Sequence, residues 1–155
     1  MIQLRRYKPT DFKQFSNLVS DPLVMDKVDG ILSKAIIEDL FASFHSNNDC
    51  LVWALETKTT KQYVGHVALL EVENNPLSKE LLFYIVKDKW NKGYGTLAAK
   101  LTIELAIKNR LCNKIIATVD ANHKYSRKIL ESLGMQIEYW DQEDKQRYPV
   151  YSISV

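Results

Sequence analysis

The sequence predicts a mixed α/β fold, in which helices cover a twisted central sheet of about seven strands. Short apolar runs of strand length alternate with segments whose apolar residues recur at helical spacing. One such run, Leu81 to Val86, leads through a glycine-bearing turn directly into a helical pattern. The 155 residues, of which 46% are hydrophobic, are enough to form one domain over residues 1–155 with a buried core.

The N-terminal part predicts one strand followed by two helices. Ile2 to Arg6 alternates apolar and polar residues, as a half-buried strand does. Thr10 and Asp11 can cap a helix that Asp21-Pro22 ends, and Ser33 can cap a second helix. The apolar positions at helical spacing are Phe12, Phe15, Leu18, Val19, Ile36, Ile37, Leu40, Phe41 and Phe44.

The middle of the chain predicts three strands. Cys50 to Leu55 and Tyr63 to Val72 are apolar runs, and the polar segment Glu56 to Lys61 between them is typical of a hairpin loop. Asn74-Asn75-Pro76 marks the next turn. Glu80 to Val86 follows as a strand expected to be buried on both faces.

The C-terminal part predicts two helices and three strands. Gly134 is expected to stop the second helix in the left-handed conformation. The final two strands are expected to flank a polar loop over residues 141–147. These elements are the helix Gly93 to Asn109, the strand Lys114 to Val119, the helix His123 to Leu133, and the strands Met135 to Trp140 and Tyr148 to Val155.

The predicted order is therefore strand, two helices, three strands, helix, strand, helix and two strands, with about four helices in total. In shorthand this is an α+β mixed sheet with the order β-α-α-β-β-β-α-β-α-β-β. Hairpin-length connections favour antiparallel pairing, while the connections through helices favour parallel pairing. Ligands bind such sheets outside the carboxyl ends of the strands, where the glycine turn lies.

Composition narrows the classes of partner. A net charge of +2 does not indicate a nucleic-acid or membrane surface. The chain shows no secretory signal and no apolar run of membrane-spanning length, so we expect a cytoplasmic protein. Cys50 and Cys112 are expected to be buried or half-buried thiols, and His45 and His66 lack partners at metal-ligand spacing, so no metal is expected.

The glycine turn from Lys89 to Thr96 lies between the buried strand and the helix. A helix start leaves several backbone N–H groups without acceptors, at the positive end of the helix dipole, and glycine lets a phosphate approach the main chain. The turn is therefore a candidate phosphate site. It is not the dinucleotide fingerprint, because no third glycine follows, and it is not a P-loop, because no Gly-Lys-Ser/Thr occurs.

Trp90-Asn91-Lys92-Gly93-Tyr94-Gly95 resembles the Arg/Gln-x-x-Gly-x-Gly/Ala motif of the GNAT N-acetyltransferase superfamily. Tryptophan at its first position is similar to the branch that acetylates ribosomal-protein N-termini, as is Glu80 ten residues earlier. Ser126 to Met135 is similar to the second signature of that branch, Ser-x-x-x-Leu-Glu-x-Leu-Gly-Phe/Met. Looser similarities, at Asp11, Asp21-Pro22 and Gly65, extend the resemblance over nearly the whole chain.

The resemblance implies acetyl-CoA as donor and a primary amine as acceptor, which reacts by direct attack in a ternary complex. It also implies that a bulge splays the fourth strand from the fifth, so that the pantetheine arm pairs with exposed main chain. The residues expected to bind the cofactor are Ile85 and Val86 for the arm, Lys92, Gly93, Tyr94, Gly95 and Thr96 for the pyrophosphate, and Asn122.

The catalytic residues implied by the resemblance are Glu80 and Ser126. Glu80 is the candidate general base, acting through water, although a solvated residue at the start of a strand is the alternative. Many superfamily members protonate the thiolate with a tyrosine where this chain has Leu130. Ser126 is then the candidate donor, with Tyr125 as another candidate and a local helix-start role for Ser126 as the alternative. The usual asparagine of the branch is replaced by His123, so that either Asn122 or His123 contacts the cofactor.

Two other functional classes remain open from sequence. One is a CoA-binding sensor without catalysis, and the other is a nucleotide-binding regulatory domain. The acceptor is a protein N-terminus or a small amine, in a pocket expected from the first two helices and the loops over residues 56–61 and 141–147. Trp53, Trp140 and Phe44 are expected in the core, with a place in the lining of the acceptor pocket as the alternative. Neither a membrane nor a nucleic-acid partner is expected, and the protein is a monomer or a homodimer.

Overall fold

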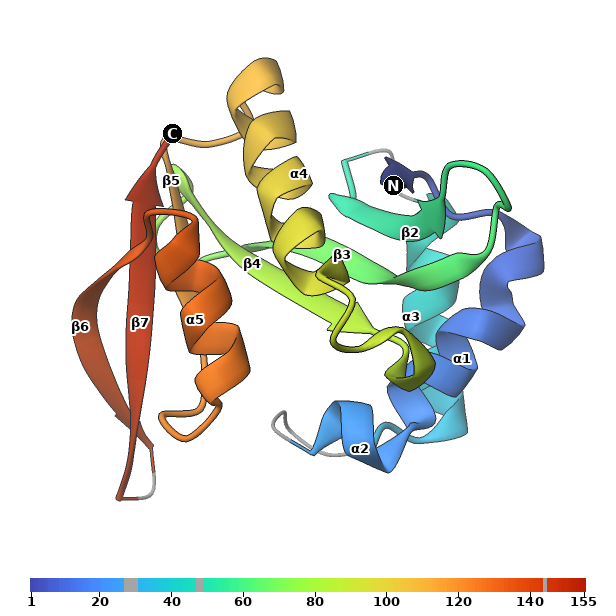
Figure 1. Ribbon diagram of the computed structural model, residues 1–155, viewed down its shortest axis with the longest axis horizontal. Helices are drawn as coiled ribbons and strands as arrows, with labels where there is room; N and C mark the ends of the chain where they lie inside the picture. Colours follow the sequence, from blue (N-terminus) through green and yellow to red (C-terminus); the bar gives the residue numbers. More distant parts are fainter. Residues whose placement is uncertain (27–30, 47–48, 144) are drawn as a thin grey trace.

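Seven strands form one sheet in the order β1-β2-β3-β4-β5-β7-β6 in the computed structural model, which describes residues 1–26, 31–46, 49–143 and 145–155 (Figure 1). The strands are β1 (Ile2–Arg5), β2 (Val52–Thr57), β3 (Tyr63–Glu71), β4 (Ser78–Ile85), β5 (Lys114–Thr118), β6 (Gln136–Glu143) and β7 (Gln146–Ser154). The helices are α1 (Phe12–Ser20), α2 (Pro22–Met25), α3 (Lys34–Ser46), α4 (Tyr94–Asn109) and α5 (Lys124–Ser132), with short 3-10 turns η1 (Pro9–Asp11) and η2 (Lys87–Lys89).

The mixed sheet and the element order are confirmed, with one additional helix. Strands β1 to β4 pair antiparallel, β4 and β5 pair parallel, and β7 inserts between β5 and β6 with antiparallel pairing on both sides. The additional helix, α2, begins where Asp21-Pro22 ends α1. The Asp21 carboxylate caps α2 by accepting from the Leu23 N–H at 2.9 Å, and Pro22 takes the first helical position.

The polar loops expected around residues 56–61 and 141–147 are shorter than predicted. Strand β2 continues through Thr57, and β6 and β7 pair as far as Glu143 opposite Gln146. Asp144, which the prediction placed in the second loop, lies outside the described residues. Both predictions were wrong because these strand residues are polar and lack the apolar pattern that indicates a strand. Glu56 belongs to a buried ion pair, and β6 lies at the exposed edge of the sheet. Every residue of β6 is exposed.

Helices cover the two faces of the sheet with separate apolar clusters (Figure 1). On one face, α4 packs through Ala98, Ala99 and Ala106, whose small side chains are completely buried and let the helix approach the strands closely. On the other face, α1 and α3 contribute the second cluster. Its fully or nearly fully buried members include Phe15, Ile37, Phe41, Ala54 and Ala68.

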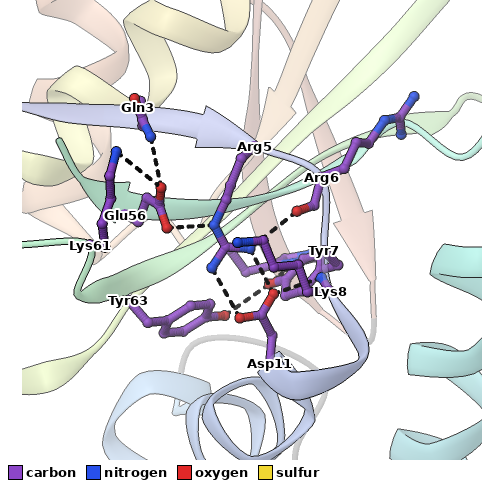
Figure 2. A network of polar contacts seen from close by, with 10 residues as sticks. Gln3, Arg5, Arg6, Tyr7, Lys8, Asp11, Glu56, Lys61 and Tyr63 are labelled. Atoms are coloured by element: carbon purple, nitrogen blue, oxygen red, sulfur yellow. Dashed lines mark hydrogen bonds and ion pairs between the residues drawn. The ribbon is translucent and has the colours of Figure 1, made fainter.

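A polar network ties β1, β2 and the start of α1 together at one edge of the sheet (Figure 2). The Arg5 guanidinium donates to both Asp11 carboxylate oxygens, at 2.7 and 3.0 Å, and to Glu56 Oε2 at 2.5 Å. Gln3 donates to the other Glu56 oxygen at 2.7 Å. Glu56, expected in a loop, is thus a buried member of this network.

The network sets the ionisation of its two carboxyl groups. Burial is the largest single influence and raises the pKa of Asp11 and of Glu56. The hydrogen bonds from Arg5, together with those from the Lys8 N–H to Asp11 and from Gln3 to Glu56 and with the nearby positive charges, outweigh burial and hold each pKa below its ordinary value. Both groups therefore stabilise the fold when ionised. That contribution is complete above the pKa values of the unfolded chain, about 4, and is lost as the pH falls through the lower folded values.

Replacing Arg5 by glutamine removes the cation that compensates two buried carboxylates. We expect Arg5→Gln to lower the free energy of unfolding at pH 7 by about 2–4 kcal/mol, measured by urea denaturation. The matched control is Lys34→Gln, which removes the exposed Lys34–Glu38 pair and is expected to change stability by less than about 0.5 kcal/mol. Equal stability of Arg5→Gln and wild type at pH 7 contradicts the prediction.

Gly65 allows β3 and β4 to pair closely just before β4 ends. A Cβ atom at this position would lie 2.1 Å from the Tyr84 carbonyl oxygen, which is main chain and cannot rotate away. Glycine is therefore required here by space, rather than by a left-handed backbone. The same position supports the strand that lines the site described below.

We expect Gly65→Ala to destabilise the protein by about 1–3 kcal/mol, because the added methyl pushes the end of β4 away. The measurement is the midpoint of chemical denaturation. Gly95→Ala is the control: its Cβ would meet the flexible end of the Ile129 side chain at 2.9 Å, which can move. A Gly65 variant no less stable than the Gly95 variant would show that β4 tolerates the displacement.

Candidate active site

Strands β4 and β5 are paired at their starts and then separate. Their parallel pairing runs from Ser78 opposite Lys114 to Glu80 opposite Ile116 and ends there, although β4 continues to Ile85 and β5 to Thr118 (Figure 1). The splay expected from the resemblance is therefore present. The expected bulge is not, because the β3–β4 ladder runs from Glu71 opposite Lys79 to Gly65 opposite Ile85 without a shift in register.

The register determines which backbone groups of β4 face the opening. The Val86 N–H donates to the Val64 carbonyl at 3.0 Å, so Val86 belongs to the β3 side of the strand. Leu77 faces β5, since its carbonyl accepts from the Asn113 N–H at 2.8 Å. Backbone groups alternate along a strand, so even-numbered residues of β4 bond to β3. Phe83 and Ile85 then present their N–H and C=O groups to the opening.

This assignment corrects the expected role of the Val86 main chain. Val86 was expected to share the pairing edge with Ile85, but its N–H is occupied by β3. Phe83, two residues before Ile85, takes its place on the open edge. The apolar pattern alone gives no signal for this, because it predicts the strand but not which of its edges each residue faces.

A cavity of about 660 Å³ occupies the opening. Its walls come from the separated strands, from the turn between β4 and α4, and from the starts of α4 and α5. The lining residues are Val24, residues 80–85, 89–91, 93–96 and 117–120, His123, Tyr125, Ser126, Ile129 and Leu130.

The turn at the end of β4 exposes the amides of the α4 N-terminus. Gly93 caps the helix with φ +77°, and no atom lies within 4 Å of the position that a Cβ would take. The first intrahelical bond starts at the Leu97 N–H, which donates to the Gly93 carbonyl at 3.1 Å. The N–H groups of Tyr94, Gly95 and Thr96 precede it and have no acceptor within the helix, which favours an anion at this end of the 16-residue helix.

Most of the residues singled out from sequence line this cavity. Those inside are Glu80, Ile85, Gly93, Tyr94, Gly95, Thr96 and Ser126. Val86, Lys92 and Asn122 are not among the lining residues. The Lys92 ammonium instead donates to the Asp88 carbonyl at 2.9 Å, and the Asn122 N–H donates to the Asp120 carboxylate at 2.7 Å.

His123, rather than Asn122, faces the cavity. Its Nε2 atom lies 3.5 Å from Ser126 Oγ, near the limit for a hydrogen bond. Tyr125 also lines the cavity, with 72% of its surface exposed. Leu130, at the position where the resemblance implies a tyrosine in other members, is completely buried and carries no proton.

Glu80 stands where the two strands separate. It is half-buried, and it pairs with Leu70 of β3 and Ile116 of β5. Because side chains alternate between the faces of a strand, Glu80 shares its face with Leu82 and Tyr84, toward α1 and α3. The carboxylate therefore sits on the opposite face of the sheet from α4.

A buried aromatic cluster supports this second face. The His66 ring stacks on Tyr84 with centroids 6.1 Å apart, and its Nδ1 atom lies 2.9 Å from the Tyr7 hydroxyl. That hydroxyl also lies 2.8 Å from the Tyr63 hydroxyl. Burial lowers the pKa of His66 to about 3, so the ring is neutral at physiological pH. The cluster positions Tyr84, which lines the cavity.

A second groove, of about 560 Å³, adjoins the cavity and shares Val24 and Lys89 with it. Its other lining residues come from α1, from the Asp21 cap of α2, from η2 with the preceding Val86, and from the start of β3 with the preceding Gln62. Its charged members, besides Lys89, are Asp21, Asp88 and Lys87. Of the two helices expected to build the acceptor pocket, α1 lines this groove, whereas no described residue of α3 lines either space. The additional helix α2 contributes instead, and no described residue of 56–61 or 141–147 lines either space.

The three large aromatic side chains that we expected in the core behave differently from one another. Trp53 is buried and Phe44 packs against the second apolar cluster. Trp140 does not belong to the core: it is 41% exposed, with the guanidinium groups of Arg127 and Arg147 over its ring at 5.9 and 4.9 Å. Trp140 is exposed because it lies on β6, the edge strand of the sheet, whose residues are all exposed.

Two features are absent from the described residues, and both concern other classes of site. No group of three or more His, Cys, Asp or Glu side chains within these residues is arranged to hold a metal ion. Within the same residues, no helix has both the length and the apolar character needed to cross a bilayer.

A comparison with known protein families identifies the family, and comparisons with solved structures identify the fold. Residues 2–136 match the family model described as an acetyltransferase (GNAT) domain. The fold is similar to that of spermidine N-acetyltransferase from Vibrio cholerae in complex with CoA and spermine, with a TM-score of 0.86 and 18% identity over 99% of this chain and 95% of that one.

Two further solved structures share the fold. A GNAT-family acetyltransferase from Bacillus anthracis gives a TM-score of 0.82 at 21% identity, over 99% of this chain and 94% of that one. Ribosomal-protein-S5-alanine acetyltransferase from Vibrio fischeri gives 0.81 at 17% identity, over 99% and 92%. At these identities the likenesses establish the fold, while the match over residues 2–136 establishes the family.

Proposed function

The chain belongs to the GNAT acetyltransferase family, and on that premise we propose that residues 1–155 form a single domain that transfers the acetyl group of acetyl-CoA to a primary amine by direct attack in a ternary complex. The acceptor is a protein N-terminus or a small amine. The observation that carries the proposal is the junction of an open strand edge with a helix N-terminus in one cavity.

The residues of that junction fit the chemistry of acetyl-CoA. The donor supplies an activated thioester, a pantetheine arm with amide groups, and a pyrophosphate. The open edge of β4 at Phe83 and Ile85 offers main-chain partners for amides, as an added strand requires. The amides of Tyr94 to Thr96, beside the open space at Gly93, suit the pyrophosphate.

Glu80 is proposed to help remove the proton of the acceptor amine. An alkylamine is almost wholly protonated at pH 7 and cannot attack until it loses a proton. Glu80 lines the cavity at the point where the strands part, on the face opposite α4. A carboxylate acting there through a water molecule serves an acceptor that enters from the α1–α2 side.

Ser126 is proposed to protonate the departing thiolate, with Tyr125 as the competing candidate. Both line the cavity, and Leu130 carries no proton to give. A thiol of ordinary pKa, about 8.5, is a good leaving group, so a weakly acidic hydroxyl suffices. The His123 ring, 3.5 Å from Ser126 Oγ, is placed to influence this hydroxyl.

Direct attack is favoured over a covalent cysteine intermediate. Neither Cys50 nor Cys112 is among the described residues that line the cavity. Burial raises the pKa of both thiols, which lowers the fraction of reactive thiolate.

The experiment that tests the function has two stages. Calorimetric titration with acetyl-CoA measures binding, and a thiol-release assay over a panel of amines and N-terminal peptides then measures turnover. Turnover with any amine supports the proposal. Binding without turnover would support a CoA sensor, and binding of ATP or GTP without CoA would support a nucleotide-binding domain.

Initial velocities with both substrates varied test the order of chemical events. Lines that intersect in a double-reciprocal plot are expected for a ternary complex. Parallel lines would contradict direct attack and indicate an acyl-enzyme, for which Ser126 beside His123 is the candidate nucleophile.

We expect Glu80→Gln to lower kcat about 100-fold, the lower end of what general bases contribute, with the largest loss at low pH, where the amine is most protonated. The control is Glu104→Gln on the exposed side of α4, which pairs with Lys100 at 3.9 Å outside the cavity. A pH–rate profile of Glu80→Gln that coincides with wild type would remove Glu80 from the mechanism.

A further inference from the structure

The side chain of Trp90 is bonded to the main chain of the open strand. Its indole Nε1–H donates to the Ile85 carbonyl at 2.8 Å, a good hydrogen-bond length. The tryptophan lines the cavity and is 40% exposed. A side chain of the turn thus reaches back to the last residue of β4.

The acceptor of this bond lies on the edge that faces the opening. Ile85 is an odd-numbered residue of β4, so its carbonyl points away from β3 and toward the space that β5 has left. Trp90 therefore occupies the final carbonyl of the open edge. The groups left for a ligand are the N–H of Ile85 and both backbone groups of Phe83.

The other bonds of the turn do not make this connection. The Lys89 and Trp90 N–H groups donate within η2, to the carbonyls of Val86 and Lys87 at 2.9 and 3.1 Å. The Lys89 ammonium donates to Gln62 beside the β2–β3 turn at 3.2 Å. The indole bond links the turn to the open edge itself, and so holds the α4 amides at a fixed separation from that edge.

We propose that Trp90 is a positioning residue for the acyl donor: its indole sets the register of the donor arm on β4 and the spacing between the arm site and the pyrophosphate site. This rests on the proposed function. A neutral donor on a rigid ring suits the task, because the ring has two rotatable bonds and brings no charge to the edge. With the last carbonyl occupied, an incoming arm has one register rather than two.

Fragments of CoA distinguish the proposed positioning role of Trp90 from a merely structural role. CoA spans both sites, whereas ADP, with its pyrophosphate, uses the turn and pantetheine uses the strand edge. Loss of the indole N–H in Trp90→Phe disturbs the spacing between the two sites, and neither site by itself. We therefore expect CoA to bind about three- to tenfold more weakly to this variant, the equivalent of one hydrogen bond, and ADP and pantetheine to change less than twofold.

Calorimetry measures the three affinities, and thermal unfolding checks that each variant is folded. Trp140→Phe is the matched control. The exposed fraction of Trp140, 41%, is nearly the same as the 40% of Trp90, and Trp140 lies on β6 outside the cavity. Trp90→His keeps a ring N–H donor and is expected to bind CoA with intermediate affinity. If Trp90→Phe does not fold, the CoA affinity of Trp90→His tests the inference instead.

Two results would overturn the inference. One is a folded Trp90→Phe protein that binds CoA within twofold of wild type. The other is a loss for ADP or pantetheine as large as the loss for CoA, which would make Trp90 an ordinary contact of that fragment. Failure of the wild-type protein to bind CoA at all would instead reject the proposed function, so the two failures are distinguishable.

Discussion

The separation of β4 from β5 beyond Glu80 is the constraint on which the site depends. β4 keeps its ladder with β3 as far as Ile85 while its other edge loses a partner after Glu80. Backbone groups enclosed by protein need hydrogen-bond partners, so an edge opened inside a fold requires compensation. The Trp90 indole satisfies one carbonyl of that edge. The groups that remain are the ones that the proposed function assigns to the donor arm.

The same separation connects the two faces of the sheet. α4 and α5 cover one face, and α1 and α3 cover the other, so in a continuous sheet the two sides would be isolated from each other. At the opening, the α4 amides and Ser126 lie toward one side, while Glu80 and Tyr84 lie toward the other. A donor and an acceptor can then meet from opposite faces. The stacked, neutral His66 beneath Tyr84 stabilises that second side without adding a charge.

Local patterns predicted the parts of the site that are local in the chain. The apolar run before Val86, the glycines at 93 and 95, and Gly134 as the stop of α5 each depend on neighbouring residues, and the structure has the strand, the turn and the helix stop at these places. The strand is only half-buried at Leu82, Phe83 and Tyr84, rather than buried on both faces, because β5 leaves it there. The direction of the Val86 N–H and the bond from Trp90 to Ile85 depend on strand register, which sequence pattern does not fix. Glu56 was misassigned for a related reason, because its partner Arg5 lies 51 residues away.

The contrast between features set by neighbouring residues and features set by tertiary structure also explains why the donor is easier to infer than the acceptor. The donor would be bound largely by main chain, through a strand edge and a helix start, and the residues that permit this leave a recognisable motif. The second groove, on the side proposed for the acceptor, is built from three separate segments, with Asp21 and Asp88 set against Lys87 and Lys89. Its formal charges cancel, so selectivity there must come from the placement of individual groups rather than from a net field. On this proposal, a fixed donor site beside an acceptor groove built from side chains would let one fold acquire new acceptors without altering its chemistry.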